Sequence, residues 1–310
     1  MQYFQPNAAV LAGVVLSLVL ASGWPSVGQA KAAGERRQER VQPAGISITP
    51  ASDSAVTLEK REEGEHRYLL AGNPLPGPVE MEVILREATN MVAEPPLPHR
   101  IVLPPHSSAP IITLRRQDPA QDGGIRYAYG YLPGSPDVRH REDYPYLPPI
   151  SPGSTYRITQ GFFGQHSHHG EQNQYAVDIG MPKRTPVHAA RGGVVMGLED
   201  GVSENGVEAA LRFHANQLRI LHDDGTMAVY AHLTTGSGLV QIGDQVEAGQ
   251  RIGYSGNSGY SSGPHLHFVI QHNTGMKLES LPFRFVLPDS TLREPAEGML
   301  LQGAALAQNH

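Results

Sequence analysis

The chain has 310 residues, of which 39% are hydrophobic and 17% are charged, and its formal net charge is −6 at pH 7. This length allows two domains with a sizeable core, and the acidic balance gives no electrostatic basis for binding nucleic acid. The 34 glycines and 26 prolines favour short strands and turns over long helices. The chain has no cysteine, so its fold must rely on its core or on a metal rather than on disulfide bonds.

The N-terminal segment has the pattern of an export signal. An apolar run from Ala8 to about Gly23 is followed by small residues suited to cleavage after Ala30 or Ala32. The run is shorter than a comfortable membrane span, although no Lys or Arg precedes it as a signal peptide would have. We predict a signal peptide over residues 1–32 and a periplasmic or secreted protein, with a membrane anchor as the alternative if the segment is not cleaved.

The rest of the chain divides by its pattern of turns. Residues 33–45 are polar and predict a flexible lead-in, whereas residues 46–146 hold short alternating segments at the spacing of an immunoglobulin-like β-sandwich. Residues 147–156 are rich in proline and glycine and predict a linker. A second β-rich domain follows over residues 157–285, and residues 286–310 form a C-terminal tail. The predicted fold class is therefore all-β.

Histidine is concentrated in the second domain, where 10 of the 15 lie between His166 and His272. In the segment SGPHLHFVI (262–270), His265 and His267 share one face of a predicted strand, and the opposite face is apolar enough for a core. The alternative is that His265 and His267 are buried histidines with a purely structural role. A metal or acid–base site explains the concentration better, because it needs several imidazoles together.

Two further strands bring polar side chains that fit such a site. Asp178 alternates with apolar residues in YAVDIG, and His232 ends a hairpin strand after the HDDG turn. Two histidines and one aspartate form a ligand set suited to tetrahedral Zn²⁺ with water in the fourth position. The chemistry alone does not tell which histidine of the H-x-H pair binds the metal. We expect the remaining histidines of this domain to be structural or surface residues: His188, His214, His222 and His272.

Residues 168–268 resemble the lysostaphin-like (LytM-type) family of zinc metalloendopeptidases that act on peptidoglycan. The resemblance rests on H-x-G at His168–Gly170, on the downstream Asp178 and on TPVHAARGGVV, YAHL, IGDQVEAGQRIGYSGNSG and SGPHLHF, which follow in the family's order. It implies an antiparallel β-sheet peptidase domain with one zinc ion, bound by His168, Asp178 and His267. It also implies that His232 and His265 are catalytic histidines that do not bind the metal.

One departure from the family leaves the first ligand open. The compact family pattern is H-x-G-x-D, whereas here seven residues separate Gly170 from Asp178. His168 fits an extended form of the pattern, and His169 remains the alternative.

The resemblance implies an exported enzyme that hydrolyses peptide cross-links of peptidoglycan through a zinc-activated water. A non-enzymatic cell-wall regulator or activator with the same fold is an alternative that the complete residue set disfavours, and a secreted protease of general substrates is another. The partners would be peptidoglycan peptides and possible cell-wall enzymes or regulators. The sequence does not specify the bond cleaved, the oligomeric state, or whether the N-terminal domain targets or restrains the catalytic one.

Overall fold

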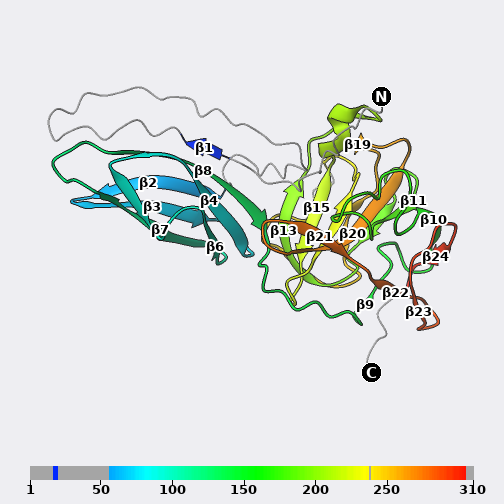
Figure 1. Ribbon diagram of the computed structural model, residues 1–310. Coiled ribbons are helices and arrows are strands. Elements are labelled where there is room, and N and C mark those ends of the chain that lie inside the picture. Colours follow the sequence, from blue (N-terminus) through cyan, green and yellow to red (C-terminus); the bar gives the residue numbers. More distant parts are fainter. Residues whose placement is uncertain (1–16, 20–55, 237–238, 305–310) are drawn as a thin grey trace, which may run out of the picture.

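The computed structural model describes residues 17–19, 56–236 and 239–304, and in this part the chain forms two β domains side by side (Figure 1). The all-β prediction is confirmed, since the described residues hold strands and one short 3-10 helix, η1 (Ala209–Phe213). Apart from strand β1, the predicted signal peptide and lead-in lie outside the described residues. Within the described part, no helix is long and apolar enough to cross a membrane.

The first domain is a sandwich of two four-stranded sheets. One sheet has the order β1 (Ser17–Val19), β8 (Gly124–Pro133), β4 (Val79–Thr89) and β6 (His99–Leu103). The other has the order β2 (Thr57–Glu63), β3 (His66–Asn73), β7 (Ser107–Arg116) and β5 (Met91–Glu94). Alternate residues of both sheets, such as Leu69, Met81 and Tyr127, are fully buried between them. That the sandwich is immunoglobulin-like remains a prediction.

The second domain is built on a nine-stranded antiparallel sheet. Its order is β17 (Gln245–Val246), β13 (Gly193–Glu199), β15 (Gln217–Leu221), β16 (Met227–Ala231), β20 (His265–Asn273), β11 (Val177–Gly180), β10 (Thr155–Gln160) and β24 (Leu300–Gln302), with β21 (Leu278–Leu281) also pairing with β20. Smaller sheets join β12 (Pro186–His188) to β18 (Arg251–Tyr254), β14 (Asn205–Gly206) to β19 (Gly259–Tyr260), and β9 (Pro145–Tyr146) to β22 (Arg284–Val286) and β23 (Leu292–Arg293).

The two faces of the large sheet have different surroundings. Leu266, Phe268 and Ile270 of β20 are fully buried in the main core of the domain, so the apolar face predicted for this strand is the core face. Strand β16 pairs residue by residue with β20, and β15 pairs in the same way with β16. The side chains of all three strands therefore alternate between the same two faces. The opposite face is therefore the one that can hold a polar site.

Segments at both ends of the second domain belong to its packing. Leu147 and Ile150, within the predicted linker, are buried there, and Tyr146 packs on Phe283 at 5.9 Å between ring centroids. In the predicted C-terminal tail, β24 adds an edge strand beside β10, and its Leu301 is fully buried.

The two domains share an apolar contact. Met196 of β13 is buried in the core cluster of the first domain, and Leu221 of β15 packs against the same cluster. Gly77 has no room for a side chain, because a Cβ there would lie 2.3 Å from the Met196 sulfur. The Glu80 carboxylate accepts a hydrogen bond of 2.5 Å from the main-chain N–H of Met276. The first domain thus abuts the sheet that carries the polar face described next.

Candidate active site

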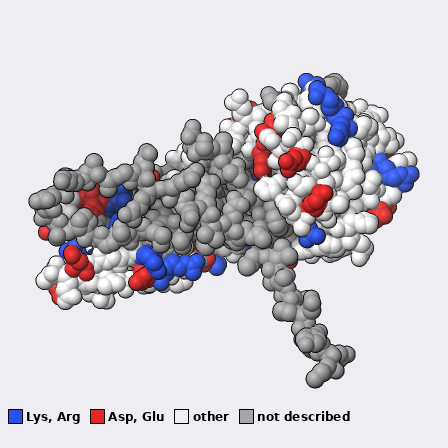
Figure 2. Space-filling view, turned by 90° about the horizontal axis from the view of Figure 1, so that it is seen from above, with Lys and Arg blue, Asp and Glu red and all other residues white. Residues whose placement is uncertain are grey.

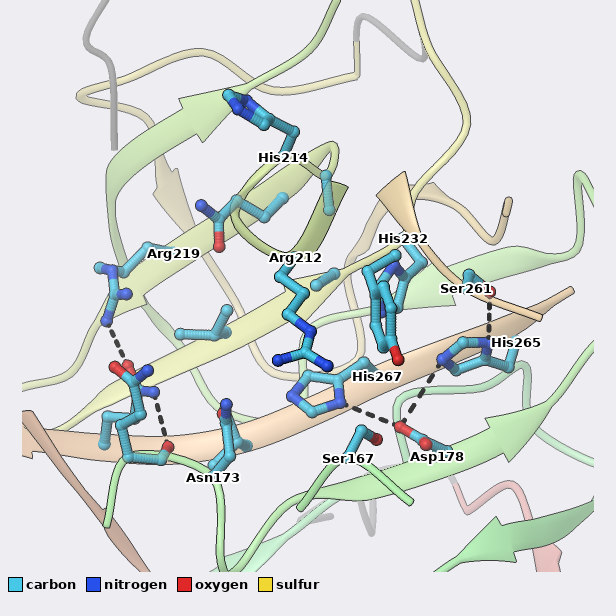
Figure 3. Close-up of a pocket in the computed structure, with 18 of the residues that line it drawn as sticks. Ser167, Asn173, Asp178, Arg212, His214, Arg219, His232, Ser261, His265 and His267 are labelled. Atoms are coloured by element: carbon cyan, nitrogen blue, oxygen red, sulfur yellow. Dashed lines mark hydrogen bonds and ion pairs between the residues drawn. The ribbon is translucent and has the colours of Figure 1, made fainter. Parts of the chain in front are cut away.

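The candidate site lies on the polar face of the large sheet, where one row of residues crosses several strands. Asp178 on β11 is paired with His267 on β20, and His267 is paired with Ala231 on β16. On the other side, Gln160 at the end of β10 is paired with Asp178. Because paired residues of neighbouring strands point to the same face, Gln160 stands beside Asp178. Asp178 in turn faces His267 (Figure 3).

Three side chains converge closely enough to hold one metal ion. Ligand atoms of His168, Asp178 and His267 lie within 4.8 Å of one another. His168 Nε2 is 3.2 Å from Asp178 Oδ1, and His267 Nδ1 is 2.9 Å from the same oxygen. His168 and Asp178 are buried, at 2% and 8% exposure.

The orientation of His168 fits a metal ligand. Its Nδ1–H donates to the carbonyl oxygen of Gly161 at 2.8 Å, which leaves Nε2 unprotonated and directed at Asp178. Nε2 is buried and has no hydrogen-bond partner. A buried imidazole nitrogen without a partner, beside a carboxylate and a second imidazole, is a donor set that suits zinc.

Gln160 positions both Asp178 and the loop that carries His168. Its amide nitrogen donates to Asp178 Oδ2 and to Ser167 Oγ, each at 2.8 Å. Its amide oxygen accepts from the main-chain N–H of His166 at 2.9 Å. Gly164 makes room for this arrangement, since a Cβ there would lie 2.1 Å from Gln160 Cγ.

The cluster keeps Asp178 ionised. Burial alone would raise the pKa of Asp178, but the adjacent imidazoles of His168 and His267 outweigh burial and hold the pKa well below its usual range. Burial lowers the pKa of His267, so its ring is neutral near pH 7. A carboxylate and neutral imidazoles are the protonation states that bind a metal.

His232 and His265 lie beside the three-residue cluster. Their ring centroids are 4.6 Å apart, and His232 is 5.9 Å from His267. The Nδ1–H of His232 donates to the Ser258 carbonyl at 2.7 Å, and that of His265 donates to the Gly263 carbonyl at 2.8 Å. Both rings therefore present Nε2 to the cavity, and His265 Nε2 is 3.7 Å from Asp178 Oδ1.

His232 has two further features of a functional residue. Its φ of +61° lies in the left-handed region, which is unusual for a residue other than glycine and is often found at functional sites. Burial, with a smaller contribution from His265 and His267, lowers the pKa of His232 to about 3. The ring is therefore neutral near pH 7, with its lone pair on Nε2.

The structure brings all five predicted site residues together: His168, Asp178, His232, His265 and His267. His169 is exposed and lies outside the three-residue cluster, although it lines the same cavity. Of the histidines expected to be structural, His222 is buried with Nδ1 donating to the Gly192 carbonyl at 2.8 Å, whereas His214 is exposed at the cavity rim.

The cavity over the site has a volume of about 820 Å³ and is lined by both domains. The second domain contributes Asp178, His232, His265 and His267. Further along it contributes Arg219 and Gln271, and the first domain contributes Leu75 and Leu132. Sequence reasoning missed Gln160 and Arg219. The alternation of Arg219 with the core residues Leu218 and Ile220 could have placed it on the polar face. Alternation places Gln160 with the core residue Ile158, and only the register shift between them brings it beside Asp178.

Comparisons with known proteins agree with this site. Residues 172–278 match the model of Peptidase family M23, a range that includes Asp178, His232, His265 and His267 and begins after His168. The chain is 39% identical over 103 residues to the glycyl-glycine endopeptidase ALE-1 of Staphylococcus capitis, which covers 33% of this chain and 25% of that protein. It is 39% identical over 93 residues to the peptidoglycan DD-endopeptidase ShyA of Vibrio cholerae, which covers 30% of this chain and 19% of that protein.

The chain thus spans a quarter or less of the length of these two relatives. Among solved structures, the catalytic domain of the antimicrobial peptidase lysostaphin from Staphylococcus simulans is 29% identical, with a TM-score of 0.27, over 46% of this chain and 88% of that one. Residues 172–278, within the second β domain, are thus similar to Peptidase family M23.

Proposed function

We propose that the protein is an exported zinc metalloendopeptidase that hydrolyses peptide cross-links of peptidoglycan. The observation that carries the proposal is the arrangement of five side chains. Three of them are close enough together to bind one metal ion, and two imidazoles lie beside these three. His168, Asp178 and His267 would hold the zinc ion. When bound, zinc supplies Lewis-acid chemistry, polarising the scissile carbonyl and making water more acidic.

The two remaining histidines supply acid–base chemistry. His232 is neutral, and its Nδ1–H is engaged by Ser258, so Nε2 is the atom that takes a proton from the attacking water. His265 has Nδ1 engaged by Gly263 and presents Nε2 on the same side as Asp178. In the imidazolium form, which carries a proton on both nitrogens, its Nε2–H would stabilise the developing oxyanion or give a proton to the leaving amine. Asp178 stays ionised and accepts a hydrogen bond from the Nδ1–H of His267.

The names of the two relatives support a cell-wall substrate. ALE-1 is described as a glycyl-glycine endopeptidase and ShyA as a peptidoglycan DD-endopeptidase. The cavity over the polar face of the sheet is where a peptide substrate would bind. Action on peptidoglycan requires export, and we infer a periplasmic or secreted protein on that ground.

A digest of purified peptidoglycan tests the proposal. The zinc-loaded full chain should release peptide fragments, a chelator should abolish release, and added zinc should restore it. Mass spectrometry of the new termini then identifies the bond. His265→Ala should lose activity but keep zinc, whereas the matched control His99→Ala, in the first domain, should be as active as the wild type.

Other outcomes point elsewhere. If zinc-loaded protein releases no fragments, the peptidase proposal fails and a non-enzymatic regulator of cell-wall enzymes becomes the better account. If casein is cleaved as fast as peptidoglycan peptides, the enzyme is a protease of general substrates.

A further inference from the structure

Arg219 is a buried cation on the same sheet face as the candidate metal cluster. It lies on β15, is only 5% exposed and lines the cavity (Figure 3). No carboxylate in the described part of the chain forms an ion pair with it, and its Nε–H is buried without a hydrogen-bond partner. Burial lowers the pKa of Arg219 to about 10, so the guanidinium is still protonated at neutral pH.

Gln271 holds the guanidinium in place. Arg219 Nη1 donates to Gln271 Oε1 at 2.9 Å, and the amide nitrogen of Gln271 donates to the carbonyl oxygen of Gln172 at 2.8 Å. The glutamine is neutral and does not balance the charge. A buried cation without a counter-ion lowers stability, so its presence calls for an anion that arrives from outside.

The sheet register places Arg219 at a defined distance from the cluster. Arg219 is paired with Val229, and Val229 with Val269, which lies two residues beyond His267 on β20. Two strand spacings across and two residues along correspond to about 12 Å between the Cα positions of Arg219 and His267. An extended peptide covers this distance in roughly three or four residues.

On the face shown in Figure 2, blue and red side chains are scattered over the second domain rather than gathered in one cationic patch. Arg212 is also at the cavity, but it is exposed and its guanidinium lies over the Tyr260 ring at 5.4 Å. A solvated arginine discriminates weakly between anions and neutral groups, whereas a buried one discriminates strongly.

We propose that Arg219, held by Gln271, binds a free carboxylate of the substrate peptide. A guanidinium matches a carboxylate with two parallel hydrogen bonds, and Gln271 engages only Nη1 of Arg219. The inference rests on the proposed function and narrows it to peptides with a carboxylate about three or four residues' length from the bond cleaved. That carboxylate is either the C-terminus of the peptide or a side chain.

The test measures binding and does not depend on turnover. The probes are fluorescently labelled cross-linked peptides released from peptidoglycan, prepared unmodified, with amidated C-termini, or with amidated side-chain carboxylates. Fluorescence anisotropy gives their dissociation constants for the zinc-loaded full chain carrying His265→Ala. We expect one of the two amidated forms to bind about ten- to a hundredfold more weakly, the effect of losing a hydrogen bond to a charged group, and which form it is identifies the carboxylate.

Three variants in the same background check the assignment. With Arg219→Met, the unmodified peptide should bind as weakly as the more weakly bound amidated peptide does when Arg219 is present. This variant should therefore no longer distinguish these two peptides. Arg219→Lys keeps the charge but lacks the paired donors, so it should retain part of the preference. Arg212→Gln removes a cation from the cavity rim and should leave the preference unchanged.

The inference is overturned if the wild-type residue binds all three probes equally, or if Arg212→Gln removes the preference as fully as Arg219→Met does. Thermal unfolding of each variant verifies folding, and Arg219→Lys stands in if Arg219→Met does not fold. If the wild-type chain released no peptide fragments in the peptidoglycan digest, the proposed function would be rejected, independently of the binding test of Arg219.

Discussion

Replacing Gln160 by leucine should weaken zinc binding without unfolding the domain. Leucine fills nearly the same volume but cannot donate to Asp178 Oδ2 or accept from the His166 N–H, which Gln160 does at 2.8 and 2.9 Å. Asp178 then keeps its two histidine neighbours but loses the hydrogen bond that fixes its second oxygen. The loop that carries His168 also loses its tie to β10.

The magnitude follows from the bond to the carboxylate. A hydrogen bond to a charged group contributes about 1.5–3 kcal/mol, which corresponds to roughly a ten- to hundredfold change in affinity. Asp178 is 8% exposed, so water replaces little of the lost bond. Loss of an outer partner of a metal ligand typically costs about 10–100-fold in metal affinity, and we expect an effect of this size.

Competition with a chromogenic chelator measures the zinc dissociation constant, and thermal unfolding verifies the fold. Thr159→Val is the matched control. Thr159 donates to the main-chain carbonyl of Asp178 at 3.2 Å, so its loss removes a bond to the same residue but not to its carboxylate. The reasoning is refuted if folded Gln160→Leu binds zinc within about twofold of the wild type, or if Thr159→Val weakens binding equally.

Three further predictions use other parts of the structure. His168→Asn should lose zinc, measured by metal analysis after dialysis, whereas His169→Asn should keep it; the opposite result would make His169 the ligand. A chain that starts at Asp137 keeps Tyr146 in the core and lacks the cavity wall formed by the first domain, so it should digest peptidoglycan faster than the full chain, and an equal or lower rate would contradict restraint by that domain. Burial lowers the pKa of His222 to about 4, so only the unfolded chain gains its proton as the pH falls below 6.5. Between pH 7.5 and 5.0, the free energy of unfolding measured with denaturant should therefore fall by about 2 kcal/mol more for the wild type than for His222→Asn. An equal fall in both proteins would show that His222 is not the group responsible.

The site could be found from sequence largely because strands alternate. His265 and His267 were predicted to share a face opposite a core face, and Leu266 and Phe268 do form that core. Asp178 lies beside His267 on this polar face, as the period of two and its chemistry predict. His232 reaches the site in another way, because Ala231 is the β16 residue paired with His267, and His232 follows the strand with a φ of +61°.

The choice between His168 and His169 needed the folded loop. The side chains of adjacent loop residues do not alternate in direction in a regular way. Since both candidates are histidines, the sequence does not tell which one points to the metal. In the structure, the Gly161 carbonyl orients His168, and Gln160 anchors the residues just before it. Both contacts depend on how the loop returns to the end of β10, which no local pattern specifies.

Arg219 illustrates a different obstacle. In NQLRILHDDG it alternates with apolar residues, and an arginine in such a strand ordinarily indicates a solvent-facing side. Here the face opposite the core is itself covered, because the first domain and the loops around the cavity close over it. The same register that brings Asp178 beside His267 fixes the offset of Arg219 from the cluster. A correct strand pairing would therefore have predicted both the candidate metal cluster and its distance from Arg219. Without the pairing, the histidines are recognisable by their chemistry, and the arginine is indistinguishable from a surface residue.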